Sequence, residues 1–160
     1  MKGKVVCELA PTKENNRNSE GDFITLTDGS ILYAYSRYSG DGFEDGDSAD
    51  IYAIKSFDNG ETFGEPFLLF SRDRVKAENI MSVSFLRMEN SDIGMFYLRK
   101  IENGDCLLEV IRSSDEGKTW SEPVRCMQSP GYYVTNNDRV IRLKNGNILA
   151  PGNLHKKTEG

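Results

Sequence analysis

The chain has 160 residues, of which 38% are hydrophobic and 28% are charged, and its formal net charge is −5. This size fits a single soluble globular domain. The acidic balance argues against a general nucleic-acid or membrane-surface binder, and no apolar run reaches the roughly 18 residues of a membrane span. The first residues include lysines but no long apolar core, so the sequence favours a cytoplasmic protein, with secretion as the alternative if a signal peptide was removed.

The cysteine content argues against a metal site. Cys7, Cys106 and Cys126 are odd in number and lack the spacing of zinc ligands. We therefore expect reduced, partly buried thiols, and we expect neither a metal nor an organic cofactor.

Nearly every segment has the pattern of a strand, a turn and a second strand. Residues 22–27 and 30–35 flank Asp28-Gly29, a pair that favours a two-residue hairpin turn. A third strand is predicted at 51–56, whereas the charged residues 72–79 fit either a loop or a short helical turn. The remaining predicted strands are 66–70, 80–87, 94–99, 106–112, 124–127, 137–143 and 147–151.

One eight-residue pattern occurs twice. Residues 56–63 and 113–120 both read Ser-x-Asp-x-Gly-x-Thr-aromatic, and each copy continues into a small residue followed by Glu-Pro. In such a turn the Asp carboxylate accepts hydrogen bonds from nearby amides and the Gly supplies a positive φ. The copies are 57 residues apart, which is the length of one supersecondary repeat. We expect the following residues to build turns: Ser56, Asp58, Gly60, Thr62, Phe63, Ser113, Asp115, Gly117, Thr119 and Trp120.

Four strands per repeat with tight inner turns are typical of a β-propeller blade. We expect an all-β, partial propeller over residues 1–160, with a first blade at about 17–70, a second at about 78–128 and the start of a third at about 132–160. Propellers close with about 4–8 blades, so this stretch leaves blade edges and an apolar face open. Either the chain is a fragment of a longer protein or copies associate through the open edges.

Candidate site residues lie where inner strands and their loops would meet at one mouth of the propeller channel. Arginines offer guanidinium forks to a carboxylate, amides bind hydroxyl groups, and the acids Asp45, Asp47 and Asp50 are available to protonate a leaving group. This combination suits an anionic sugar. The catalytic candidates are Asp47 and Glu20, and the substrate-binding candidates are Arg17, Arg37, Asn79, Asn137, Asp138, Arg139 and His155.

Simpler interpretations of these residues stay open. Glu20 can cap a turn, Arg37 can be a surface residue at a strand end, and Asp47 can belong to a solvated acidic loop. Residues 45–50 do not fit a calcium-binding EF-hand, because they lack a ligand at the fifth position and a Gly at the sixth. Residues 137–139 can form an internal network that fixes the blade, and a lone histidine is more often a satisfied polar residue than a ligand.

The chain resembles the N-terminal half of the bacterial sialidase-like Asp-box, or BNR-repeat, glycosyl hydrolases. The resemblance rests on both eight-residue motifs and on residues 17–22, 47–49, 81–84, 96–100 and 130–141. It implies a six-bladed propeller, of which the chain covers about two and a half to three blades, and hydrolysis of a terminal anionic sugar such as sialic acid.

By position, the resemblance implies that Arg17 is the first carboxylate-binding arginine, that Arg37 is the arginine before the acid loop, and that Asp47 is the acid. It also implies that two further arginines and a Tyr–Glu nucleophile pair belong to later blades, so that this chain alone is inactive. The alternative is a non-catalytic Asp-box module that binds glycan or protein or supports an assembly, because fold alone does not give function.

Overall fold

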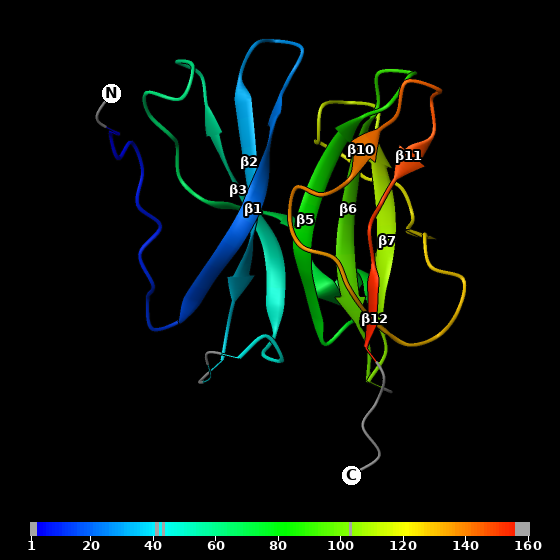
Figure 1. Cartoon of the computed structure of the whole chain (residues 1–160). Coiled ribbons are helices and arrows are strands. Elements are labelled where there is room, and N and C mark those ends of the chain that lie inside the picture. The colour runs from blue at the N-terminus through cyan, green and yellow to red at the C-terminus, as the bar shows by residue number, and fades with distance from the viewer. Residues whose placement is uncertain (1–2, 41, 43, 103, 156–160) are drawn as a thin grey trace.

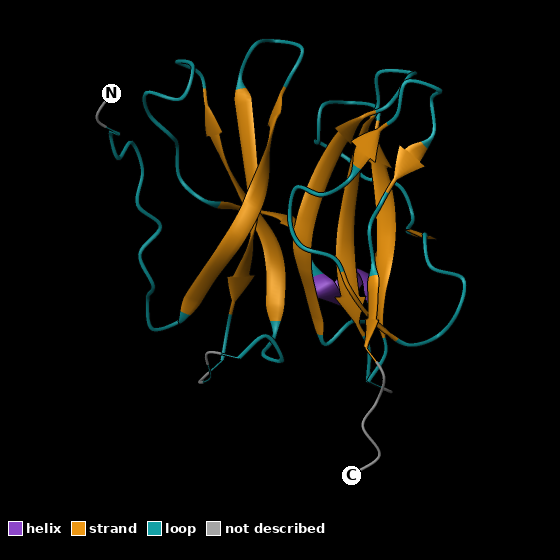
Figure 2. Ribbon diagram, viewed as in Figure 1, coloured by secondary structure: helices purple, strands orange, loops and turns teal. Residues whose placement is uncertain are grey.

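The structure is a computed structural model, and it describes residues 3–40, 42, 44–102 and 104–155. A four-stranded antiparallel sheet lies beside a larger sheet, and a long C-terminal hairpin joins the edge of that larger sheet (Figures 1 and 2). The one helical element in the described residues is η1 (Arg72–Val75), a single 3₁₀ turn capped by Ser71. The prediction of an all-β protein is confirmed.

The first sheet has the strand order β1-β2-β3-β4, all antiparallel. The first turn lies at the predicted position, but it has three residues, 27–29, in place of two, because Leu26 pairs with Ser30. The Asp28 carboxylate accepts the backbone N–H of Ser30 at 2.9 Å, and Gly29 has a φ of +82°. The strands are β1 (Arg17–Thr25), β2 (Ile31–Tyr38), β3 (Ala49–Ser56) and β4 (Phe67–Phe70).

The second sheet repeats this arrangement, with β8 pairing along β7. Its strands are β5 (Asn79–Arg87), β6 (Ile93–Lys100), β7 (Cys106–Ser113) and β8 (Val124–Arg125). The chain then forms an interrupted hairpin in which β9 pairs with β12 and β10 pairs with β11, and β9 joins the second sheet through a parallel pair with β7. The hairpin strands are β9 (Tyr132–Val134), β10 (Ile141–Arg142), β11 (Ile148–Leu149) and β12 (Asn153–His155).

The hairpin differs from the prediction of one continuous strand over 137–143. Residues 135–140 leave the ladder between β9 and β10, and they turn toward the second sheet instead. There the backbone N–H of Asp138 donates to the carbonyl of Val83 at 3.1 Å. A bond to the neighbouring sheet thus replaces pairing within the hairpin.

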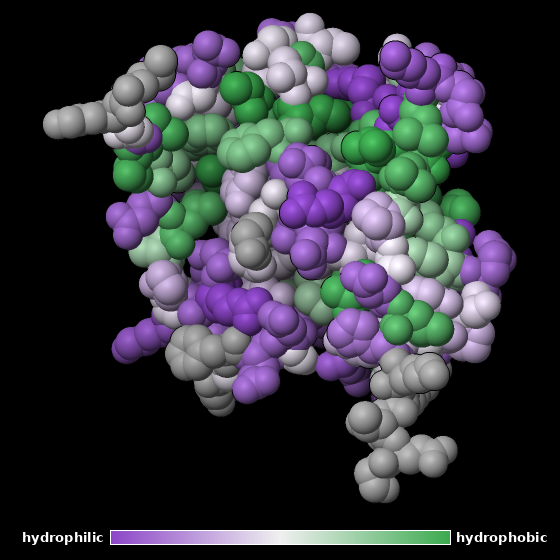
Figure 3. Space-filling view, in the orientation of Figure 1, coloured by the Kyte–Doolittle hydropathy of each residue, from purple (hydrophilic) through white to green (hydrophobic). Residues whose placement is uncertain are grey.

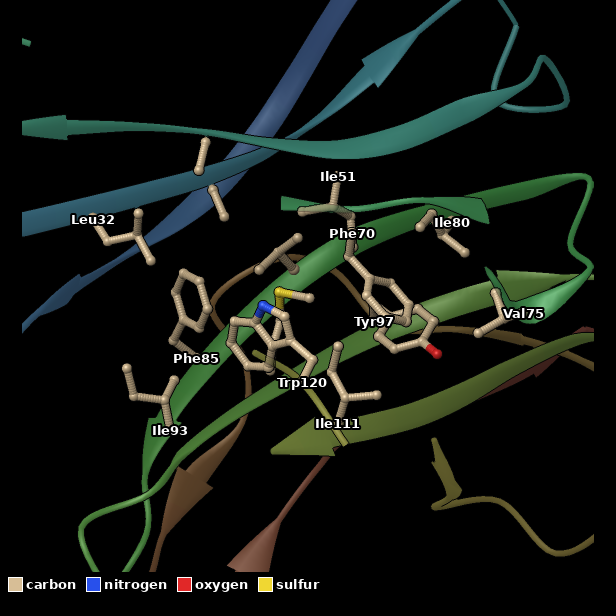
Figure 4. Close-up of a cluster of buried hydrophobic side chains, with 14 of the residues drawn as sticks. Leu32, Ile51, Phe70, Val75, Ile80, Phe85, Ile93, Tyr97, Ile111 and Trp120 are labelled. Carbon is tan, nitrogen blue, oxygen red and sulfur yellow. The ribbon is translucent and has the colours of Figure 1, made fainter. Parts of the chain in front are cut away.

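Apolar side chains fill the space between the two sheets. Ile51 and Phe70 of the first sheet face Ile80, Tyr97 and Ile111 of the second (Figure 4). A second cluster lies between the second sheet and the hairpin, and it includes Leu98, Leu108 and Val140. Because successive residues of β6 alternate between the two clusters, this strand is apolar on both faces, as the unbroken hydrophobic run at 93–98 requires.

Side chains also tie each inner strand to the next one. Asp22 of β1 is 8% exposed, and its Oδ2 accepts the backbone N–H of Phe85 in β5 at 2.6 Å. One layer further, the Ser84 hydroxyl accepts the backbone N–H of Arg139 at 3.0 Å. Burial raises the pKa of the Asp22 carboxyl, and the bond from Phe85 opposes that shift. The hydrogen bond from Phe85 therefore offsets part of the cost of burying the Asp22 carboxylate.

Replacing Asp22 with alanine is expected to lower the free energy of unfolding by about 1–3 kcal/mol, because the Phe85 N–H is left without its acceptor in a buried interface. Urea unfolding followed by circular dichroism measures this. Glu65→Ala, at an exposed position, is the control and should stay within about 0.5 kcal/mol of wild type. An Asp22→Ala effect no larger than that of the control would remove this bond from the account of how the sheets are joined.

Both copies of the eight-residue motif form the same exposed turn. Asp58 Oδ1 accepts from the Ser56 hydroxyl at 2.8 Å and from the Thr62 backbone N–H at 2.9 Å. The corresponding bonds to Asp115, from the Ser113 hydroxyl and the Thr119 N–H, are both 2.8 Å. In each copy the Asp is followed by a non-glycine residue and then by a glycine, Gly60 or Gly117, whose φ is positive. The carboxylates are thus fully engaged within their own turns.

These turns predict a specific acid sensitivity. Hydrogen bonds from the Thr62 and Thr119 side chains, followed by those from their backbone N–H groups, lower the pKa of Asp58 and Asp115 to about 2 from an ordinary value of 3.8. Because the folded-state pKa is the lower one, this stabilisation is present above about pH 4 and is lost as the pH falls toward 2.

The Asp58→Asn, Asp115→Asn double variant should therefore lose less of its unfolding free energy than wild type between pH 4 and pH 2. Urea titrations at a series of pH values measure the two slopes. Equal slopes would mean that the turn carboxylates do not contribute to the acid sensitivity.

Candidate functional site

A pocket of about 440 Å³ lies where β1, β5 and the hairpin segment between β9 and β10 come together. Each of these three elements departs from regular pairing at the pocket. The register of β1 shifts between Asn18 and Gly21, and that of β5 shifts between Met81 and Ser84. Such bulges free backbone groups and redirect side chains. The pocket therefore arises from one irregularity that occurs in three successive layers.

The walls of the pocket carry charges of both signs. The guanidinium of Arg17 lies 4.2 Å from the centre of the Tyr38 ring and forms an ion pair with Asp45. On the hairpin side, the Arg139 guanidinium donates to the backbone carbonyl of Asp138 at 3.2 Å. Asn137 also lines the pocket, and its Oδ1 is buried without a hydrogen-bond partner among the described residues. The pocket thus presents two cations, two acids (Asp45 and Asp138) and amide groups.

The loop between β2 and β3 brings one acid to the pocket and turns another away. The Asp45 side chain lines the pocket. Asp47 instead accepts the backbone N–H of Glu44 at 2.9 Å, so its carboxylate closes a turn within the loop. Asn79, which is fully buried at the start of β5, donates to the backbone carbonyls of both Asp45 and Asp47. The second sheet therefore holds the acidic loop of the first.

Of the predicted substrate-binding residues, the pocket lining includes Arg17, Asn137, Asp138 and Arg139. Asn79 lies behind the lining, where it contacts the loop backbone. Ser19, Ser82 and Tyr38 also line the pocket. Sequence reasoning missed the two serines because nothing in the sequence marks where a strand bulges.

The other predicted residues lie elsewhere. Arg37 is next to Tyr38 in β2 and points to the opposite face, where its guanidinium is 4.5 Å from the centre of the Tyr52 ring. There it lines a separate cavity of about 310 Å³ beneath the N-terminal segment. His155 is exposed in β12, with its ring 6.0 Å from that of Tyr132. The backbone of Glu20 belongs to β1, whereas its side chain lies outside the described part of the structure.

A buried tyrosine–glutamate pair lies between the two sheets, outside the pocket lining. The Tyr97 hydroxyl donates to Glu109 at 3.0 Å, and the Arg99 guanidinium donates to the other carboxylate oxygen at 3.2 Å. Burial, together with the charge of Glu109, raises the pKa of Tyr97 well above its usual range. Because Tyr97 is fully buried against Phe70, the pair has no access to a ligand and acts in packing.

The three cysteines are free thiols, of which Cys7 is exposed, Cys106 is buried and Cys126 is half-buried. Burial raises the pKa of Cys106 to about 12 and that of Cys126 to about 11, so both thiols stay protonated at neutral pH. Across the described residues, His, Cys, Asp and Glu side chains do not gather in groups of three or more that could hold a metal ion. The described part of the chain also contains no helix long and apolar enough to cross a membrane.

No family model and no curated protein sequence matches the chain, but solved structures do. The Hadza microbial sialidase Hz136 matches with a TM-score of 0.66 and 17% identity, over 83% of this chain and 31% of that one. A protein of unknown function from Dyadobacter fermentans matches with a TM-score of 0.67 and 19% identity, over 86% and 46%. The endo-arabinase from Bacteroides thetaiotaomicron matches with a TM-score of 0.56 and 15% identity, over 89% and 57%.

At these identities the likeness is one of fold, and it gives the chain a sialidase-like fold. The chain spans between about a third and somewhat over half of the length of these three structures.

Proposed function

We propose that the chain forms about two and a half to three blades of a six-bladed, sialidase-like β-propeller, and that the whole protein is a glycoside hydrolase acting on terminal sialic acid or a related anionic sugar. The sialidase-like fold and the two matching turns 57 residues apart support this proposal. In this proposal the first blade is the sheet of β1 to β4, the second consists of β5 to β8, and the hairpin, which joins β7 through β9, begins the third.

The outer face of the hairpin supports the assignment to a larger propeller. Hydrophobic surface gathers over β10 and β11 (Figure 3). In a closed ring the next blade covers this face. Its apolar residues are contiguous, whereas the surface of a monomer ordinarily carries them singly. Association of copies through the same face is the alternative occupant, and light scattering distinguishes a defined oligomer from a monomer. The apolar residues of this face are Ile141, Leu143, Ile148 and Leu149, which are 38–50% exposed.

The observation that carries the proposed activity is the convergence of Arg17 and Arg139 on one pocket. Guanidinium groups bind a carboxylate through two parallel hydrogen bonds, and the serines and amides of the same lining suit the hydroxyl groups of a sugar. The volume of about 440 Å³ lies within the range of small-molecule sites. Together these groups match a sugar that carries one carboxylate.

In the proposed mechanism, Asp45 is the general acid. A general acid must reach the oxygen that it protonates, and Asp45 is the acid of the β2–β3 loop whose side chain lines the pocket. When the sugar carboxylate binds Arg17, Asp45 leaves its ion pair and faces the glycosidic oxygen. Asp47, the acid that the family resemblance implies, is the competing assignment.

Binding of N-acetylneuraminic acid to the chain tests the pocket. Arg17→Gln should weaken binding about tenfold or more, because a charge-assisted hydrogen bond to the carboxylate is lost. An NMR titration measures the dissociation constant. Arg37→Gln removes the same charge outside the pocket and should leave affinity unchanged, and the methyl ester of the sugar should bind weakly to wild type. Equal binding of acid and ester would overturn carboxylate recognition by this pocket.

Turnover tests the acid in a protein that joins this chain to its later blades. Asp45→Asn should lower kcat for a chromogenic sialoside by about 10²–10⁴-fold, whereas Asp47→Asn should have a much smaller effect. The release of the chromophore measures both rates. The reverse order would assign the acid role to Asp47.

The second candidate function is a non-catalytic module that binds glycan or protein. It is favoured by the engagement of Asp47 within its own loop, which leaves one acid of the loop at the pocket. Binding of the sugar acid by the complete propeller without hydrolysis would support this candidate.

A further inference from the structure

The loop between β2 and β3 is anchored from outside its own sheet. Asn79 begins β5 in the second sheet, and its fully buried amide donates to the Asp45 carbonyl at 3.4 Å and to the Asp47 carbonyl. These two carbonyls flank Gly46, at the tip of the loop. The Asn79 side chain thereby fixes the position of the loop backbone beside the pocket.

Asp45, which Asn79 anchors, also forms the ion pair with Arg17. The Asp45 backbone is held by Asn79, while its carboxylate forms an ion pair with Arg17. Arg17 is itself placed by the ring of Tyr38, and 74% of its side-chain surface is covered, since 26% is exposed. A carboxylate of the protein therefore lies against the same guanidinium that a carboxylate ligand needs.

We propose that Asn79 is a positioning residue and Asp45 a specificity-determining residue: together they make the β2–β3 loop an internal competitor for the anion site at Arg17. A ligand must displace the Asp45 carboxylate before it can bind this guanidinium. The sugar identity of the ligand rests on the proposed function, whereas the competition itself concerns any carboxylate.

The competition is weak enough for a good ligand to overcome. Asp45 is 72% exposed at its side chain, so its pair with Arg17 is screened by water, and removing it should strengthen carboxylate binding by no more than about fivefold. A neutral sugar offers the guanidinium only uncharged hydroxyl acceptors, which are weaker than the Asp45 carboxylate that it must displace. The loop therefore raises the selectivity of the pocket for ligands that bring their own carboxylate.

The experiment uses the full chain with two probes, N-acetylneuraminic acid and acetate, the second being a carboxylate without a sugar. Asp45→Asn should raise the affinity for both probes, by up to about fivefold, in an NMR titration. Asp47→Asn is the matched control: it removes the same charge from the same loop without touching Arg17, and it should leave affinity unchanged. An Asp45→Asn affinity that is lowered, or equal to that of Asp47→Asn, would overturn the competition.

Hydrogen exchange tests the positioning role separately. Asn79→Ala should speed exchange of the Asp47 amide, which donates to the Glu44 carbonyl at 3.1 Å, by about tenfold or more, and it should raise acetate affinity in the same direction as Asp45→Asn. Val83→Ala removes a fully buried side chain from the same strand and controls for general loss of stability. Asn79→Ala exchange no faster than that of Val83→Ala would overturn the anchoring.

The two probes keep this inference apart from the proposed function. If acetate affinity rises in Asp45→Asn while the sugar acid binds no better than acetate, the competition stands and the sialic acid assignment fails. If the sugar acid binds tightly and Asp45→Asn changes nothing, the proposed function stands and the competition fails. Absence of any carboxylate binding, in wild type and in Asp45→Asn, would overturn both.

Discussion

The site depends on hydrogen bonds that run from the side chains of one inner strand to the backbone of the next. Burial of apolar surface holds the sheets together but does not fix how one slides along another, because that force has no direction. The bonds from Phe85 to Asp22 and from Arg139 to Ser84 do fix it. They align β1, β5 and the hairpin at corresponding points, so that two strand bulges and the interruption of the hairpin open onto one pocket.

Most of the fold could be predicted because its signals are local. Asp28-Gly29 determines the first hairpin turn through its own geometry, and the two eight-residue motifs determine theirs. The strand predicted over 137–143 failed because a distant partner decided it: Val83 and Ser84 bind the backbone of Asp138 and Arg139 and draw it out of the hairpin. A bond between residues about 55 positions apart leaves no trace in a single sequence.

Site residues could be predicted where their position in the repeat places them at the pocket. They could not be predicted where the direction of the side chain decides whether a residue faces the pocket. Arg17 and the run at 137–139 lie at inner-strand positions that the repeat marks, and they line the pocket. Arg37 and Tyr38 are adjacent, so only one can face the pocket, and the register that pairs Arg17 with Tyr38 decides between them. The path of the acidic loop depends on Asn79, which is 34 residues from Asp45, so the sequence did not separate Asp45 from Asp47.

Backbone strain marks the same pocket without any appeal to family resemblance. Among the described residues, the non-glycine positions with positive φ include Asn59, Glu116 and Ser91, which lie in tight turns that require it. Ser82, with a φ of +61°, lies instead within strand β5, and Asp138, with a φ of +51°, lies where the hairpin leaves its ladder. Each costs about 1–3 kcal/mol, and such strain persists where the surrounding structure enforces it. Both residues line the pocket, so the strained backbone at these positions helps to form its walls.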